Sequence, residues 1–321
     1  MDGSVGYIVI DPDETTKDYL GKKQRHEKAV REMLEKLKGQ PDVTTDGKKI
    51  KVYANITNPF DVDAVITNDA RGIGLFRSEF LYLGSDDFPA EEVQFEAYKT
   101  VVQRMNGKRV IIRTMDIGAD KKIGYFGLAD EANPALGMRA LRICLTRPEI
   151  FKTQLRALYR ASAYGKLAIM FPMVSSLWEV QETKRMCSAV MAELKKERIP
   201  YDENLELGVM IETPAAVMIA PELAREVSFF SIGTNDLTQY TIALDRQSIC
   251  GLEKFYDAKH PAVLRMIKMT VVAAHEAGIC GELAADSSLT ETFIKMGVDE
   301  ISVSPRAILP IRNAVRNSSS V

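Results

Sequence analysis

The sequence lacks long hydrophobic runs, an excess of charge of one sign and closely spaced cysteines. No run of about 18 apolar residues occurs in its 321 residues, so the sequence predicts no membrane-spanning helix. The formal net charge is only −2, and no basic patch is interleaved with aromatic residues, which argues against nucleic-acid binding. What remains is the composition of an ordinary globular protein, with 46% hydrophobic and 27% charged residues.

Cysteine is scarce and scattered. None of Cys144, Cys187, Cys250 and Cys280 belongs to a Cys-x-x-Cys pair. Residues 1–12 also lack the basic start and apolar core of a signal peptide. We therefore expect free thiols and a cytoplasmic location.

Short apolar segments alternate with longer helical stretches from residue 51 onward. Eight such strand-plus-helix units, without a break in composition, favour a closed (β/α)8 TIM barrel over an open sheet, within the α/β class. Val263, Ile267 and Val271 recur with helical spacing, and we expect that helix to run until Gly278. The expected strands are Val52–Ile56, Ile73–Phe76, Val110–Ile112, Leu167–Phe171, Leu207–Ile211, Phe229–Ile232, a very short one at Ile279, and Ile301–Val303.

A long polar helix precedes these units. Asp11 is suited to cap it, Pro12 to its first position and Glu14 to a capping box. The helix is expected to continue to Leu37 and to end at Gly39. Helices with so few apolar residues usually bridge domains.

We accordingly expect two regions. Residues 1–40 would be the end of an upstream domain plus a linker helix, and residues 41–321 would form the barrel.

Polar residues follow the expected strands, and in a barrel all these strand ends meet at one face. Glu212 and Asp236 are hard oxygen ligands that could hold Mg²⁺ together with oxygens of a substrate. Alternatively, Glu212 caps a helix that begins at Thr213.

Arg77, Arg113 and Arg246 are suited to bind phosphate oxygens, and Asn235 adds an amide at the same face. The alternative is that each arginine pairs with a neighbouring carboxylate. Together these groups predict a site for a phosphorylated small molecule.

Two further cations are less clear from the residues alone. Lys121 lies in a charged loop and is either a ligand contact or simply solvated. Arg139 follows a loop and either points into the site or lies on a helix surface.

Cys280 lies at an expected strand end beside Gly281. Its thiol could donate a proton to a carbanion or an enolate. The alternative is a small buried apolar side chain, as most free cysteines are.

Several motifs resemble those of the phosphoenolpyruvate-utilising enzymes, and most closely the phosphoenolpyruvate–protein phosphotransferases of bacterial sugar uptake. The resemblance extends from about residue 2 to residue 316. The motifs that carry it are Gly74–Phe80, Arg113–Gly118, Phe229–Tyr240 with Asp245 and Arg246, and Cys280–Ala284.

The resemblance implies a dimerising, phosphoenolpyruvate-binding barrel. It implies Mg²⁺ binding by Glu212 and Asp236 and proton donation by Cys280 to form pyruvate. Substrate contacts are implied for Arg77, Arg113, Asn235, Asp236 and Arg246, and positions lining the site for Lys121 and Arg139.

The family's phosphohistidine motif is absent. The resemblance therefore implies phosphoryl transfer to a histidine on a separate N-terminal domain, and from there to a histidine carrier protein. The family also has about four more residues between Gly278 and Cys280, where most of the seventh strand would form. Either the barrel is narrowed there or residues are missing.

Other functions remain open. Pyruvate phosphate dikinase and phosphoenolpyruvate synthase share these motifs. A metal-dependent lyase acting on a pyruvate enolate would use the same carboxylates, and a non-catalytic phosphoenolpyruvate sensor would use the same arginines.

Overall fold

A computed structural model of the chain describes residue 6 and residues 8–121, 123–246 and 250–321. Two compact units are present, residues 1–40 and residues 41–321. Within the described ranges, no helix is both long and apolar enough to cross a membrane.

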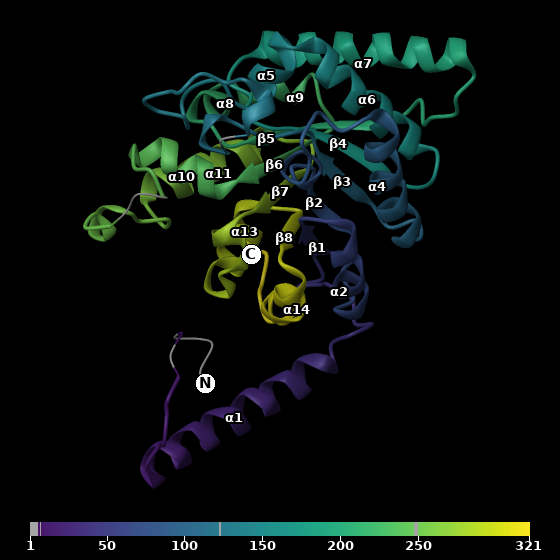
Figure 1. The fold of residues 1–321 in the computed structure, drawn as a ribbon. Helices are drawn as coiled ribbons and strands as arrows, with labels where there is room; N and C mark the ends of the chain where they lie inside the picture. The colour runs from purple at the N-terminus through teal and green to yellow at the C-terminus, as the bar shows by residue number, and fades with distance from the viewer. Residues whose placement is uncertain (1–5, 7, 122, 247–249) are drawn as a thin grey trace. The chain divides into compact units, whose positions relative to one another are not determined.

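The larger unit is a closed barrel of eight parallel strands in sequence order (Figure 1). This arrangement confirms the expected (β/α)8 fold. The ring closes where Lys51–Ala54 pair in register with Glu300–Val303. Its strands are β1 Lys51–Ile56, β2 Ile73–Arg77, β3 Val110–Arg113, β4 Leu167–Phe171, β5 Glu206–Ile211, β6 Phe229–Gly233, β7 Ala277–Cys280 and β8 Glu300–Val303.

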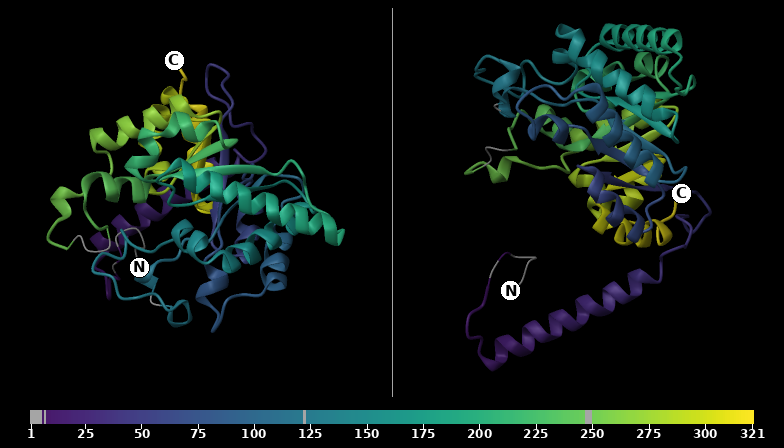
Figure 2. Two further views of the ribbon diagram at one scale, coloured as in Figure 1. Left: turned by 90° about the horizontal axis from the view of Figure 1, so that it is seen from above. Right: turned by 45° about the vertical axis from the view of Figure 1, so that its right-hand side comes forward.

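The helices of this unit lie outside the strands, as the two views of Figure 2 also show. Arg156 links three of them, because its guanidinium bonds to Glu91 of α4 and to Glu197 of α7 from its own place on α6. The helices are α2 Val62–Thr67, α3 Phe80–Leu83, α4 Glu91–Arg104, α5 Leu141–Thr146, α6 Pro148–Ser162, α7 Leu177–Glu197, α8 Pro214–Met218, α9 Ala220–Ala224, α10 Thr234–Ile242, α11 Pro261–Ala273, α12 Glu282–Ala285, α13 Thr290–Met296 and α14 Ile308–Arg316.

The barrel interior has an apolar layer above a charged one. Leu75, Ile111, Met170, Met210 and Phe229 are among the buried side chains of the apolar layer. The layer fills the barrel interior and forms the floor on which a site at the strand C-termini can rest.

The charged layer lies at the opposite, N-terminal ends of the strands. Arg109 forms ion pairs with Glu276 and Glu206, the latter at 2.8 Å, and its guanidinium lies 4.6 Å from the centre of the Phe229 ring. Glu300 is buried beside this cluster.

The region before Cys280 differs from expectation. The helix ends at Ala273 rather than Gly278, and Gly278 lies in β7. All four residues of β7 pair with β6, and the Glu276 carbonyl accepts a hydrogen bond from the Phe230 amide at 2.9 Å. Pairing with β6 and β8 therefore outweighs the local helical pattern, and a four-residue strand is sufficient to complete the barrel.

The smaller unit contains one long helix, α1 Glu14–Glu35, none of whose residues is buried. The expected cap at Asp11 is wrong. Asp13 is the N-cap, and its side chain accepts a hydrogen bond from the Thr16 amide at 2.7 Å. Asp11 lies three residues before the first helical residue and adopts a left-handed backbone conformation, so it is not placed to cap the helix. The helix also ends two residues before Leu37.

Candidate functional site

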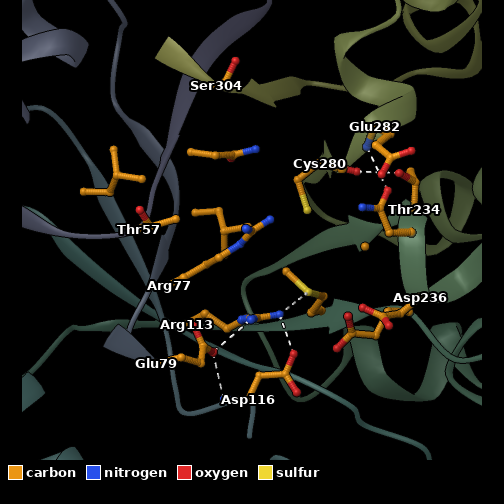
Figure 3. A pocket seen from close by; sticks show the side chains of 18 of the residues that line it. Thr57, Arg77, Glu79, Arg113, Asp116, Thr234, Asp236, Cys280, Glu282 and Ser304 are labelled. Atoms are coloured by element: carbon orange, nitrogen blue, oxygen red, sulfur yellow. Dashed lines mark hydrogen bonds and ion pairs between the residues drawn. The ribbon is translucent and has the colours of Figure 1, made fainter. Parts of the chain in front are cut away.

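A cavity of about 730 Å³ opens at the C-terminal ends of the strands (Figure 3). Strands β1, β2, β3, β5, β6, β7 and β8, or the residues directly after them, contribute to its wall. It brings together all the site residues expected from the sequence: Arg77, Arg113, Lys121, Arg139, Glu212, Asn235, Asp236, Arg246 and Cys280.

Arginines and carboxylates alternate along one wall of the cavity. Arg113 pairs with Glu79 and with Asp116, each at 2.9 Å. Arg139 binds Asp116 through two nitrogens, at 2.8 and 3.0 Å, and lies 3.5 Å from Asp236. The expected pairing of Arg113 with carboxylates is therefore present, and Arg139 points into the site rather than onto a helix surface.

This pairing fixes the charge of the groups involved. Burial opposes ionisation of Asp116, but Arg113 and Arg139 outweigh it and hold the pKa of that carboxyl well below its usual range. Burial likewise opposes the charge of Arg113, yet the surrounding carboxylates raise the pKa of its guanidinium further. Both arginines stay cationic, and their carboxylate partners keep them in place for an anionic ligand.

Arg77 differs from the other two arginines. It lies at the end of β2, where its backbone pairs with Arg113, and its exposed side chain has no hydrogen-bonding or ion-pairing partner within the described part of the chain. Figure 3 shows its side chain extending across the cavity toward the wall that carries Cys280. Its donors are therefore available to a ligand.

Glu212 follows β5 and is completely buried. One of its oxygens accepts a hydrogen bond from the Met173 amide at 2.7 Å, whereas Oε2 has no partner among the described residues. Burial, and then the nearby Asp236 and Asp116 carboxylates, raise the pKa of Glu212 to about 8. Helix α8 is capped by Thr213, so the alternative role of Glu212 as a cap is wrong.

Asp236 lies in the first turn of α10, and its buried Oδ1 has no hydrogen-bond partner among the described residues, its one contact there being the 3.5 Å ion pair with Arg139. Two buried carboxylate oxygens without such partners, in one cavity, fit a divalent cation. The described residues contain no group of three His, Cys, Asp or Glu side chains that could hold a metal. Mg²⁺ usually binds proteins through one or two carboxylates and takes its other ligands from water and substrate, so this pair suffices.

Asn235 and Thr234 hold the loop after β7. The Asn235 side-chain oxygen accepts a hydrogen bond from the Glu282 amide at 2.9 Å, which leaves its amide nitrogen as a donor. The Thr234 hydroxyl donates to the Cys280 carbonyl at 2.9 Å. These two bonds fix the position of Cys280 relative to β6.

Two other expected cations lie in less constrained places. Arg246 follows α10, and its backbone amide donates to the side-chain oxygen of Gln239 at 3.1 Å. Lys121 is exposed at the end of a short 3-10 helix, Ala119–Lys121, on the cavity wall.

Sequence reasoning misses Tyr240. Its hydroxyl accepts a hydrogen bond from Arg139 at 3.3 Å and donates to the Ala135 carbonyl, so it joins α10 to the loop that carries Arg139. Burial raises the pKa of Tyr240 to about 12. Its position four residues after Asp236 on one helix is a signal that could have placed it at the site.

Gln154 of α6 is also missed. It lies behind the arginine wall, where its side-chain oxygen accepts from the Met115 amide at 3.0 Å and its nitrogen donates to Ser78 at 3.1 Å. It thereby braces the segments that carry Arg77 and Arg113. Its spacing is a signal that could have found it, because Ile150, Gln154 and Leu158 recur every four residues and place this polar side chain on the apolar face of α6.

Gly281 should not tolerate a side chain. Its φ is +94°, and a Cβ there would lie 2.3 Å from the Thr234 hydroxyl and 2.8 Å from the Asn235 side-chain oxygen. We expect Gly281→Ala to lower the free energy of unfolding by about 1 to 3 kcal/mol in urea titrations. Gly124→Ala is the matched control, because a Cβ at that position meets no atom within 4 Å. Equal stability of the two variants would contradict the close approach at Gly281.

The family profile described as PEP-utilising enzyme, PEP-binding domain (PEP, phosphoenolpyruvate) matches residues 31–320. The phosphoenolpyruvate-protein phosphotransferase of Staphylococcus carnosus is 46% identical over 322 residues, which cover 99% of this chain and 56% of that protein. The protein of the same name in Bacillus subtilis is 44% identical over 326 residues, with the same coverage. The chain thus spans about half the length of these curated relatives.

One solved structure with a similar fold is the citrate lyase beta subunit from M. tuberculosis, complexed with oxaloacetate and magnesium. It has a TM-score of 0.45 and 15% identity, and the match covers 83% of this chain and 97% of that one. A likeness this weak does not discriminate between functions. The family profile matches nearly the whole chain, and the chain belongs to the family of PEP-utilising enzymes, of which it carries the PEP-binding domain.

Proposed function

We propose that this domain binds phosphoenolpyruvate together with Mg²⁺ and transfers its phosphoryl group to a histidine on a separate N-terminal domain, releasing pyruvate. From that histidine the phosphoryl group passes to a histidine carrier protein for sugar uptake. One observation carries the proposal: Arg77, Arg113, Arg139 and Arg246 share one cavity with Glu212 and Asp236, each of which has a buried oxygen without a hydrogen-bond partner among the described residues. Cations that can bind the phosphate and carboxylate groups of the substrate thus lie in the same cavity as carboxylates that can bind a divalent metal.

The protein groups have distinct tasks in this reaction. Phosphoryl transfer depends mainly on positioning and on neutralising charge. Arg77 and Arg246 would bind substrate oxygens, Arg113 would be held ready for them by Glu79 and Asp116, and the Asn235 amide would orient the substrate. Glu212 and Asp236 would hold Mg²⁺, which when bound neutralises charge on phosphate and enolate oxygens.

Cys280 would protonate the methylene carbon of the enolate that remains after phosphoryl transfer. Burial raises the pKa of its thiol to about 11, so the thiol keeps its proton at neutral pH and can act as a donor. Cys280 also lines the cavity, which favours proton donation over a role in core packing alone.

We further propose that the domain forms homodimers in the cytoplasm. Met218 of α8 and Met269 and Val272 of α11 are exposed apolar side chains on two helices that pack together, which supports a subunit interface. All four cysteines are free thiols, which suits a reducing compartment. Sedimentation equilibrium tests the dimer.

Thermal shift with three ligands tests the substrate. We expect phosphoenolpyruvate with Mg²⁺ to raise Tm more than phosphoenolpyruvate alone, since a ligand that binds only the folded state stabilises it. Pyruvate or oxaloacetate with Mg²⁺ should have smaller effects. A larger shift with oxaloacetate than with phosphoenolpyruvate would favour a lyase instead.

The domain by itself should not become stably phosphorylated. The three histidines, His26, His260 and His275, all lie within the described residues, and none lines the cavity. His260 instead caps α11 by accepting the Ala262 amide at 3.2 Å. Because transfer requires an acceptor in line with the phosphorus, radiolabelled phosphoenolpyruvate should leave no phosphohistidine on this chain.

Adding the histidine-bearing domain should allow transfer, but at a lower rate than in a joined chain because the effective concentration is lower. A phosphohistidine found by mass spectrometry on the isolated domain would overturn this division of labour. Binding without any transfer to the added domain would favour a non-catalytic sensor.

A further inference from the structure

The sulfur of Cys280 has two hydrogen-bonding partners on the neighbouring strand. The Ser231 hydroxyl donates to Sγ across 3.7 Å, and the thiol donates to the Ile232 carbonyl across 3.4 Å. Both side chains are buried, each about 2% exposed. The sulfur therefore accepts one hydrogen bond, from Ser231, and donates one, to the Ile232 carbonyl, within the wall of the cavity.

The register of β6 and β7 produces this pair. Ser231 pairs with Gly278, and Gly233 pairs with Cys280. Since side chains two residues apart lie on the same face of a strand, Ser231 and Cys280 both face the barrel interior. Ser231 lies one layer below the cavity, near the apolar floor, and it is absent from the cavity wall. It can thus touch the sulfur without touching a ligand.

We propose that Ser231 is a positioning residue for Cys280, whose hydroxyl holds the sulfur and stabilises the thiolate that forms when Cys280 protonates the enolate. This inference rests on the proposed function, because it assigns the support for the proposed proton donor.

The proton balance of the step is simple. The S–H bond of Cys280 breaks, and a C–H bond forms at the methylene carbon of the enolate with the electron pair of its carbon–carbon double bond. The enolate oxygen becomes the ketone of pyruvate, and the sulfur keeps a negative charge. The Ser231 O–H bond stays intact throughout. After pyruvate leaves, the thiolate regains a proton from water.

The two partners of the sulfur differ in what they offer the thiolate. The Ile232 carbonyl is an acceptor, so it has no proton to share with an anion. Ser231 can donate its hydroxyl hydrogen, and a hydrogen bond to a charged group is stronger than one between neutral groups. Stabilisation of the thiolate therefore increases at the moment when the proton leaves.

Charged groups around the sulfur act in both directions. Arg77 of β2 and Arg113 of β3 favour the thiolate, whereas Glu212 after β5 disfavours it. These groups belong to the substrate and metal machinery, and their effect changes when a ligand binds. Ser231 is neutral and lies outside the cavity wall, so no ligand in the cavity competes for its hydrogen bond to the sulfur.

Ser231→Ala tests the proposal, because it removes the hydroxyl and leaves the size of the side chain nearly unchanged. Alkylation by iodoacetamide, followed by mass spectrometry, measures the reactivity of Cys280 as a function of pH. We expect the pKa of Cys280 to be higher by roughly 0.5 to 1 in the alanine variant, because the thiolate loses one hydrogen bond. A higher pKa lowers the fraction of thiolate near neutral pH, and the greater nucleophilicity of that thiolate offsets only part of this loss. The labelling rate should therefore fall roughly two- to fourfold.

Two controls belong to this experiment. The exposed Cys250 is an internal control whose labelling rate should not change. Calorimetry of phosphoenolpyruvate with Mg²⁺ should give the same affinity for the variant and the original protein, because Ser231 does not line the cavity. Ser231→Thr keeps a hydroxyl and should restore the labelling profile.

Exchange of solvent deuterium into the methyl group of pyruvate, with Mg²⁺ present, reads out the chemistry directly. Ser231→Ala should slow it with KM unchanged, and Cys280→Ala should abolish it. Identical Cys280 labelling profiles for the serine and alanine proteins would overturn the proposal. If phosphoenolpyruvate fails to bind the original protein, the proposed function fails, whereas the labelling profiles still decide whether Ser231 supports the sulfur.

Discussion

Glu212→Gln is expected to abolish Mg²⁺-dependent binding of phosphoenolpyruvate and, at the same time, to stabilise the free protein. The side chain is completely buried, and Oε2 has no hydrogen-bond partner among the described residues. Its charge faces Asp236 and Asp116, which disfavour ionisation. Glutamine keeps an oxygen for the Met173 amide and is neutral without a proton, whereas Glu212, with its pKa raised to about 8, must take up a proton on folding near neutral pH. The free energy of unfolding should therefore rise by about 1 to 3 kcal/mol near neutral pH.

Binding should change in the opposite direction. An amide is a much weaker Mg²⁺ ligand than a carboxylate, and Glu212 is one of the two carboxylates of the proposed metal site. Changes in outer-shell partners of metal ligands typically cost 10- to 100-fold in affinity, so loss of a direct ligand should cost at least roughly 100-fold. Titration calorimetry with and without Mg²⁺ measures the effect, and Asp236→Asn should behave alike in binding.

Glu222→Gln on α9 is the matched control, because that side chain is exposed and lies outside the cavity. It should alter neither stability nor binding. A Glu212→Gln protein that loses stability together with binding would point to a structural role for Glu212. One that keeps full Mg²⁺ dependence would remove Glu212 from the metal site.

Glu300→Gln should flatten the pH dependence of stability. Glu300 is buried at the lower end of the barrel, and burial raises its pKa from 4.5 to about 8 despite the nearby Arg109. Between these two values the folded state binds the proton more tightly than the unfolded state. Protonation of Glu300 therefore stabilises the folded state fully at low pH, and this stabilisation is lost as the pH rises toward 8.

The glutamine variant has no such titration. The free energy of unfolding of the variant minus that of the original protein should increase by about 4 kcal/mol from about pH 5 to about pH 8, since each pKa unit corresponds to about 1.4 kcal/mol. Urea unfolding at a series of pH values gives this difference directly, and Glu222→Gln again controls for the loss of one charge. A difference that is independent of pH would show that Glu300 is ionised in the folded protein.

Most of the barrel could be predicted because its strands are short apolar segments that end at polar or glycine residues. Six of the eight strands extend one residue beyond the expected segment at one end, as β2 does at Arg77. The exception is β7, where only Ile279 has strand character. There, pairing with both neighbours decides the structure, and tertiary pairing is invisible in a local pattern.

The candidate site could be predicted as a set but not as a geometry. Strand order brings Arg77, Glu212 and Asp236 to one face, and that follows from the fold class alone. The alternation of Arg113, Asp116 and Arg139 does not follow, because it depends on a loop that returns to the cavity.

Ring closure through β1 and β8 has a consequence for biosynthesis. These strands are first and last in the barrel, and the buried Arg312 of α14 strengthens the seam by ion pairs with Asp42 and Asp69. During translation, the edge of β1 that pairs with β8 therefore stays unpaired until β8 and α14 leave the ribosome. Contacts so distant in sequence form slowly, and exposed strand edges invite association with other chains. We expect the nascent barrel to be a chaperone client until its last strand is released.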